Sequence, residues 1–143
     1  MLGSLLLVGW LGGQTLQVER GQAGVFTIDG SDRWAGPHGY ACTRSIKKRY
    51  GSAYLAQAIQ SGFAHRGLPC GQRVVICAGT RCATAYSIDS GPWGALDAIG
   101  RWRFRPHGIQ AGEHYRGIAD LTPQLARTLR FSGLGEVSIV KIP

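Results

Sequence analysis

The 143-residue sequence is poor in charged residues, contains a single Met, and has no long apolar run. Asp, Glu, Lys and Arg together make up only 17% of the chain, which excludes a coiled coil or a long helical bundle with charged outer faces. No apolar stretch reaches the roughly 18 residues that a membrane-spanning helix needs, so we predict no transmembrane span. No Cys-x-x-Cys pair occurs, which argues against a zinc site.

Glycine and hydrophobic residues are plentiful. The chain has 22 Gly, which favours many turns joining short strands. Hydrophobic residues make up 44% of the sequence, enough to fill one core, and the length suits one domain. These features exclude intrinsic disorder and favour a mainly β domain.

The charge is strongly unbalanced. Sixteen Lys and Arg stand against eight Asp and Glu, giving a formal net charge of +8. Such an excess favours an anionic partner, which includes nucleic acid, a membrane surface and an acidic polymer such as the cell wall. Composition alone does not choose among the three.

Cysteine usage bears on the compartment. Cys77 and Cys82 flank Ala-Gly-Thr-Arg, a plausible hairpin tip, so we favour a Cys77–Cys82 disulfide and, by elimination, Cys42–Cys70. Two disulfides are typical of a small secreted domain. Four buried free thiols are the structural alternative. We therefore expect an extracytoplasmic location, in the periplasm or cell wall, or on a virion.

The first 22 residues are ambiguous. The apolar run 5–11 has the length of a signal-peptide core, but no basic residue precedes it. We interpret 1–22 as an N-terminal arm, either a first strand or a docking arm, with a weak export signal as the alternative. The barrel domain is then 23–143.

Hydrophobic patterns predict short elements along the rest of the chain. Apolar residues at helical spacing predict a helix over 52–60, and Thr122-Pro123 is a typical helix start. The basic block 44–49 is interpreted as a solvated face. Strands are predicted over 23–28, 73–77, 82–88 and 136–142.

A long basic loop is predicted between the third strand and the second helix. Within it, 101–105 alternates cation and aromatic, so that on a strand three Arg would share one face and two aromatics the other. The Arg face would grip carboxylates or phosphates of a wall polymer. A subunit contact and a solvated hairpin are the alternatives.

Three short segments carry residues suited to chemistry. His65 lies before a Leu-Pro turn that leads into a strand. Asp89 stands where a strand ends and a Gly-Pro turn begins, a common place for a functional side chain. Asp120 lies directly before a helix.

In this order the segments resemble the double-psi β-barrel family of rare lipoprotein A. The matching stretches are Ala64-His65 through Leu68-Pro69-x-Gly71, Asp89-Ser90-Gly91-Pro92 and Ala119-Asp120-Leu121-Thr122. Tyr40-Ala41-Cys42 also resembles the Ala-Cys-Gly segment of related expansin-like and endoglucanase-like barrels. The resemblance covers roughly 23–142 and implies a six-stranded double-psi β-barrel with a polysaccharide groove, here with two short helices and the long basic loop.

The resemblance also implies a site. The family includes peptidoglycan lytic transglycosylases, in which Asp89 matches the groove aspartate, a candidate general acid/base, and His65 matches the groove histidine. The structural alternative for Asp89 is that it accepts hydrogen bonds from the backbone of its turn. For His65 it is a barrel histidine whose hydrogen bonds are all made within the fold. The candidate substrate-binding residues are Trp93, Trp34, Arg66, Arg101, Arg103 and Asp120. For Trp93 and Trp34 the structural alternative is core packing, and for Asp120 it is helix capping.

The sequence departs from the family's enzymes in three places. Those enzymes carry Gly-Glu-x-(Tyr/Phe)-Asp upstream of the histidine, whereas 42–62 contains no Asp or Glu. Ser90 replaces the usual Arg beside Asp89, and the segment 93–116 is longer than usual. The first departure counts against catalysis.

Two function classes therefore remain open. One is lytic transglycosylase-like cleavage of glycan strands, with peptidoglycan or another anionic cell-wall polysaccharide as partner. The other is non-catalytic wall binding or a virion-associated structural role, with further subunits as partners. Nucleic-acid binding is disfavoured because disulfides are expected and no nucleic-acid motif is present. We predict no cofactor and no metal ligand set.

Overall fold

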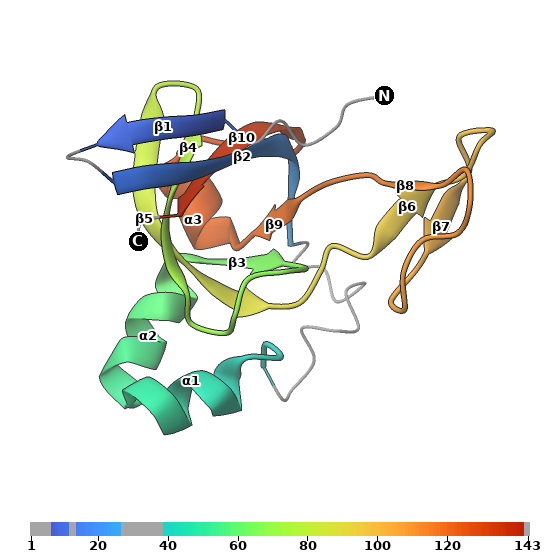
Figure 1. The fold of residues 1–143 in the computed structure, drawn as a ribbon. Helices are drawn as coiled ribbons and strands as arrows, with labels where there is room; N and C mark the ends of the chain where they lie inside the picture. Colours follow the sequence, from blue (N-terminus) through green and yellow to red (C-terminus); the bar gives the residue numbers. More distant parts are fainter. Residues whose placement is uncertain (1–6, 12–13, 27–38, 142–143) are drawn as a thin grey trace.

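The fold is a β-barrel with three short helices and a separate small sheet, seen in a computed structural model that describes residues 7–11, 14–26 and 39–141 (Figure 1). Six strands close the barrel in the order β2, β10, β4, β5, β3 and β9, and β9 pairs back onto β2. Two of the pairings, β3 with β5 and β2 with β9, are parallel, and the others are antiparallel. The barrel strands are β2 (Gln14–Val25), β3 (Gly62–His65), β4 (Arg73–Ala78), β5 (Arg81–Asp89), β9 (Ala119–Leu121) and β10 (Gly135–Lys141).

The predicted mainly β, six-stranded barrel is thus confirmed. Its first strand is longer than the pattern indicated, because β2 begins at Gln14 and pairs with β10 from Gln17 to Ala23. Part of the segment interpreted as an arm is therefore barrel wall. A further strand, β1 (Leu7–Leu11), pairs with the free edge of β2. The end of the strand predicted over 23–28 lies outside the described residues.

Alternating side chains fill the barrel interior. Phe63 of β3, Val74 and Ile76 of β4, and Leu121 of β9 are fully buried there. Because successive residues of a strand point to opposite faces, their neighbours along each strand point outward. The helix α3 (Pro123–Thr128) covers one end of this core with its buried Leu125. These outward-pointing residues form one side of the site described below.

The described part of the chain contains three helices, whereas two were predicted. The helix α2 (Ser52–Gln60) has the predicted bounds, and α3 begins as predicted, with the Thr122 hydroxyl accepting a 3.3 Å hydrogen bond from the Leu125 N–H. The additional helix, α1 (Thr43–Tyr50), includes the basic block. Only Ile46 of α1 is buried, so its sequence has no apolar period to detect.

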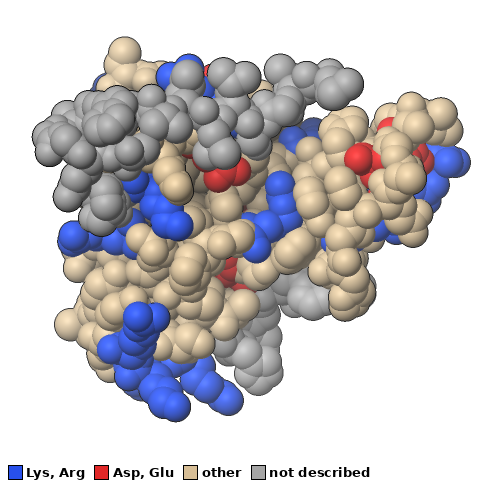
Figure 2. Space-filling model, in the orientation of Figure 1, with Lys and Arg blue, Asp and Glu red and all other residues tan. Residues whose placement is uncertain are grey.

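The basic residues of α1 remain on the surface, as interpreted. Arg44, Lys47, Lys48 and Arg49 are exposed, and Lys and Arg gather at this end of the molecule, over α1 and α2 (Figure 2). Three of them lie in the last turn of α1, where positive charge is favourable to the helix dipole.

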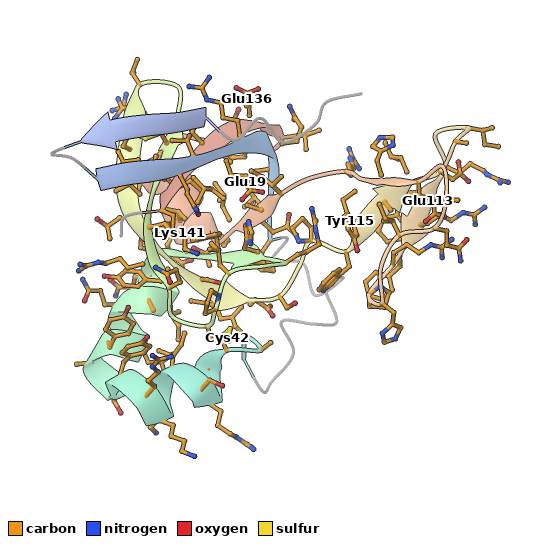
Figure 3. All side chains as sticks on the ribbon, viewed as in Figure 1. Glu19, Cys42, Glu113, Tyr115, Glu136 and Lys141 are labelled. Carbon is orange, nitrogen blue, oxygen red and sulfur yellow. A yellow bond between two sulfur atoms is a disulfide. The ribbon has the colours of Figure 1, made fainter. Side chains whose placement is uncertain are left out.

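Both predicted disulfides are confirmed. Cys77–Cys82 links directly opposed residues next to the tip of the β4–β5 hairpin. Cys42–Cys70 ties the start of α1 to the turn that precedes β4, across 28 positions of sequence (Figure 3). The second bridge holds the helical end of the molecule against the barrel.

The predicted long loop is instead a small sheet. It comprises β6 (Gly94–Leu96), β7 (Trp102–Phe104) and β8 (His114–Tyr115), in the order β7-β6-β8. The sheet stands away from the barrel between β5 and β9 (Figure 1). We call residues 93–116 the lobe. Strands of two or three residues are too short to show a period in sequence, which is why the prediction was wrong.

Ion pairs hold the lobe together. The Arg105 guanidinium donates to both Glu113 carboxylate oxygens, at 2.7 and 2.8 Å. The side chains of Arg101 and Arg103 both reach Asp97. Hydrogen bonds from the Arg101 N–H to Asp97, and from the Arg105 side chain to Glu113, lower the pKa of each carboxyl to about 2. The lobe therefore has an internal network of its own.

No helix among the described residues is long and apolar enough to cross a membrane.

One buried hydroxyl suggests a test of the barrel interior. The Ser87 Oγ, on β5, is the only fully buried side-chain polar atom in the described part of the chain without a hydrogen bond. We expect Ser87→Ala to raise the unfolding free energy by about 1 kcal/mol, because it removes an unpaired hydroxyl whose burial is costly. Thr122→Ala, which removes a bonded buried hydroxyl, should instead lower it by about 1 kcal/mol. Urea denaturation measures both, and an equal loss in the two variants would show that Ser87 has a partner.

Candidate functional site

A groove of about 950 Å³ lies between the barrel wall and the lobe. Its barrel side comes from β2, β3, β9 and the end of β5. Its other side comes from the lobe, including Trp93, Trp102 and Phe104. Two carboxylates, Asp89 and Asp120, are among the lining residues. The site is therefore a hollow with acidic groups on the barrel and aromatic rings on the lobe.

The barrel side of the groove is one row of cross-strand neighbours. Ala64 pairs with Asp89 on one side and with Asp120 on the other. Asp120 in turn pairs with Gly24. Directly paired residues point to the same face of a sheet, so both carboxylates face the groove. Two strand spacings separate their Cα atoms, which is about 10 Å.

Small residues in this row leave room for the carboxylates. Ala64 stands between the two acids and is almost fully buried. A Cβ atom added to Gly24 would lie 2.8 Å from the Asp120 Oδ1, closer than such atoms approach. Any larger side chain at position 24 would displace Asp120. The small residues of this row therefore leave open space beside the two carboxylates, as the floor of a groove requires.

A register shift turns Asp89 toward the groove. Phe63 of β3 pairs with Ser87 of β5, but the next residue, Ala64, pairs with Asp89. Ile88 is therefore one residue extra in β5, the pattern of a β-bulge. Without the shift, Asp89 would share the face of Ser87, whose side chain is buried in the interior. With it, Asp89 joins the outward row.

Burial sets the electrostatics of Asp89. Its side chain is 9% exposed. Its Oδ1 accepts hydrogen bonds from the Ser90 N–H at 2.8 Å and the Ala41 N–H at 3.2 Å, whereas no described residue donates to Oδ2. Desolvation raises the pKa of Asp89, and the two backbone donors offset that rise only in part. The carboxyl therefore keeps its proton to a higher pH than an ordinary aspartate.

His65 lies outside the groove lining and is held by local hydrogen bonds. Its Nδ1 accepts from the Gly67 and Leu68 N–H groups at 2.9 and 3.1 Å. A nitrogen that accepts two hydrogen bonds carries no proton, so the neutral ring has its proton on Nε2. That nitrogen lies 2.8 Å from the Glu19 Oε2 on β2 (Figure 3). Both ring nitrogens are thus engaged away from Asp89.

Arg66 fastens the lobe to the barrel. Its guanidinium donates to the carbonyls of Pro92 and Gly117, the two points where the chain enters and leaves the lobe. It also lies 3.8 Å from the centre of the Tyr115 ring, which is at the end of the lobe nearest the barrel (Figure 3). These contacts set the position of the lobe wall relative to the carboxylates.

The other predicted binding residues divide into two groups. Trp93 and Asp120 line the groove, and Trp93 also packs edge-on against Tyr115, with ring centres 6.0 Å apart. Arg101 and Arg103 are outside the lining and pair with Asp97 within the lobe. Trp34 lies outside the described residues. The lining residues that were not among the predicted site residues include Trp102, Phe104 and Arg116.

The sequence did contain a signal for the two aromatic lining residues, in the alternation of cation and aromatic over 101–105. It predicted that Trp102 and Phe104 share a face, and the two rings are stacked, with centres 6.4 Å apart and planes inclined by 14°. What the pattern did not show was which face meets the groove.

Comparison with known proteins adds no assignment. The sequence matches no protein-family model, and no curated protein matches it. The functional interpretation therefore rests on the groove itself and on the resemblance of the three motifs.

Proposed function

We propose that this protein acts on peptidoglycan through the groove, cleaving glycan strands in the manner of a lytic transglycosylase with Asp89 as general acid/base. One observation carries the proposal: a nearly buried carboxyl with a raised pKa stands on the floor of a groove, with one oxygen left without a donor among the described residues. Because burial raises its pKa, this carboxyl keeps its proton to a higher pH than an ordinary aspartate, which suits it to protonating a leaving group.

The reaction needs only one carboxyl. Asp89 donates its proton to the glycosidic oxygen as the bond from that oxygen to the anomeric carbon breaks. A hydroxyl of the same sugar then bonds to the anomeric carbon and returns its proton to Asp89. The products are an anhydro sugar and a new chain end, and no water is consumed. In this scheme His65 is a positioning residue, because its bonds hold the turn that carries Arg66.

A second candidate function is hydrolysis, favoured by the position of Asp120. Inverting glycosidases place two carboxyl groups about 6.5–9.5 Å apart to leave room for water. The two acids of the groove are separated by one strand, which is compatible with such a spacing. Asp120 would then be the base that activates water. The missing upstream acidic segment supports a third candidate, wall binding without chemistry.

Charge and cysteine chemistry agree with a wall polymer as partner. The formal charge of +8 favours an anionic surface, and Arg116 brings one positive charge to the groove edge. Two disulfides favour an oxidising location, in the periplasm, in the cell wall or on a virion. Two carboxylates on the floor disfavour a nucleic-acid backbone in the same groove.

Product analysis tests the proposal and separates the candidates. Purified peptidoglycan is incubated with the wild type, Asp89→Asn and Asp120→Asn, and soluble products are identified by mass spectrometry. We expect anhydro-sugar fragments from the wild type and Asp120→Asn, and none from Asp89→Asn. Fragments with ordinary reducing ends, lost in both variants, would indicate hydrolysis. Retention on the insoluble wall without fragments would indicate a binding protein, and neither fragments nor retention would overturn the proposal.

A further inference from the structure

We propose that Trp102 and Phe104 form a sugar-binding platform, an aromatic wall of the groove that stacks on the pyranose rings of a polysaccharide. The inference rests on the proposed function in one respect, that the ligand of this groove is a glycan. It assigns the task of recognition to the lobe, the segment that is longer than the usual connection in the barrels that the sequence resembles. The barrel strands supply the carboxylates.

The two rings are exposed although they are large and apolar. Trp102 is 56% and Phe104 40% exposed, and both line the groove. The two rings are stacked, with centres 6.4 Å apart and planes inclined by only 14°. Arg103, between them on β7, points to the other side of the lobe and meets Asp97. An exposed aromatic surface that rims a groove is typical of a binding site.

The platform is held in place before any ligand arrives. A Cβ atom added to Gly94 would lie 2.8 Å from the Trp102 Nε1, so the indole lies directly over the backbone of β6. The Arg105 N–H donates to the Trp93 carbonyl and the Arg116 N–H donates to the Gly94 carbonyl, both at 2.9 Å. Arg66 fixes the base of the lobe. A preformed surface loses little conformational entropy on binding.

The chemistry of the groove points to sugar rings. A pyranose has apolar C–H faces that suit an aromatic plane, and hydroxyl groups at its rim that donate to carboxylates. The groove offers both, with rings on the lobe and Asp89 and Asp120 on the barrel. A single-stranded nucleic acid would also stack, but its phosphates would face two carboxylates. The volume of about 950 Å³ lies at the upper end of the range for small-molecule sites, which fits an oligomer.

Binding isotherms on insoluble polysaccharides test the platform. The wild type, Trp102→Ala, Trp102→Phe and Ile99→Ala are mixed with peptidoglycan, chitin or cellulose, and the unbound protein is measured. Ile99 is the matched control, because it is an apolar lobe residue, 72% exposed, that does not line the groove. We expect Trp102→Ala to weaken binding at least about tenfold, the loss typical of truncating an aromatic anchor. Trp102→Phe and Ile99→Ala should stay within about threefold of wild type.

A spectroscopic readout separates a lost contact from a lost fold. The indole N–H signal of Trp102, assigned by its disappearance in Trp102→Phe, should shift when an N-acetylglucosamine hexamer is added to the wild type. Equal binding by wild type and Trp102→Ala would overturn the platform, as would an unmoved indole signal. Binding to a single-stranded oligonucleotide alone, or to none of the three polysaccharides, would overturn it too. Trp102-dependent binding to chitin or cellulose but not to peptidoglycan would support the platform and defeat the proposed function.

Discussion

Replacing Asp89 with Asn is expected to abolish glycan release and, at the same time, to leave the fold at least as stable as the wild type. Loss of a positioned general acid lowers rates by about 10²- to 10⁴-fold. The amide oxygen of Asn can still accept from the Ser90 and Ala41 N–H groups, so the turn keeps its bonds. What disappears is the charge that burial makes unfavourable.

The raised pKa of Asp89 also determines how the stability of the fold depends on pH. Burial raises the pKa of Asp89 in the folded state, so the folded protein binds the proton more tightly than the unfolded chain does. The wild type should therefore lose stability as the pH rises from the ordinary aspartate pKa to the raised one, and Asp89→Asn should lack that loss. Cleavage should also slow as the pH rises through the raised pKa, because the acid must be protonated.

Urea denaturation across pH, paired with fragment release, measures both effects. Glu136→Gln is the matched control, since it removes an acidic charge at an exposed position of β10 that does not line the groove (Figure 3). That variant should retain full activity. If Asp89→Asn were clearly less stable than wild type at neutral pH, Asp89 would be a turn acceptor whose charge the fold needs.

The second large effect concerns the Cys42–Cys70 disulfide. Its removal in Cys42→Ala/Cys70→Ala should lower the unfolding free energy by about 3–4 kcal/mol, because the bridge closes a long loop in the unfolded chain. The short loop of Cys77–Cys82 predicts only about 2 kcal/mol for the corresponding double variant. Thermal or urea unfolding compares the two.

The longer bridge should also matter to the groove. The Cys42 N–H donates to the Ile88 carbonyl at 3.0 Å, and the neighbouring Ala41 N–H donates to Asp89. Losing Cys42–Cys70 should therefore reduce glycan release from the protein that remains folded, whereas losing Cys77–Cys82 should not. Equal activity per folded molecule in the two double variants would show that the bridge acts on stability alone.

Local patterns predicted the parts of the fold that depend on neighbours in sequence. The helix over 52–60 followed from apolar spacing, the Thr122 cap from its side-chain chemistry, and both disulfides from the hairpin between Cys77 and Cys82. The helix α1 escaped prediction because it buries a single residue, Ile46. Its stability comes from packing that the sequence pattern does not display.

The candidate site depends on contacts that no local pattern contains. Asp89 was singled out by its place at a strand end, but its outward direction results from a register shift against β3. His65 pairs with Glu19, 46 positions earlier in the chain, so its engagement on β2 was invisible. The place of Trp102 in the groove lining depends on how the lobe sits against the barrel, where the Arg66 contacts hold it.

The lobe's internal ion pairs give the molecule a modular character. Among the described residues its strands pair only with one another, and its carboxylates bond to its own arginines. The chain enters and leaves it at two points whose carbonyls accept hydrogen bonds from the Arg66 guanidinium. Such an insertion can be exchanged, lengthened or reshaped in evolution without repacking the barrel. Under the proposed function, divergence between proteins built this way would change which polymer the lobe binds and leave the carboxylates of the barrel unaltered.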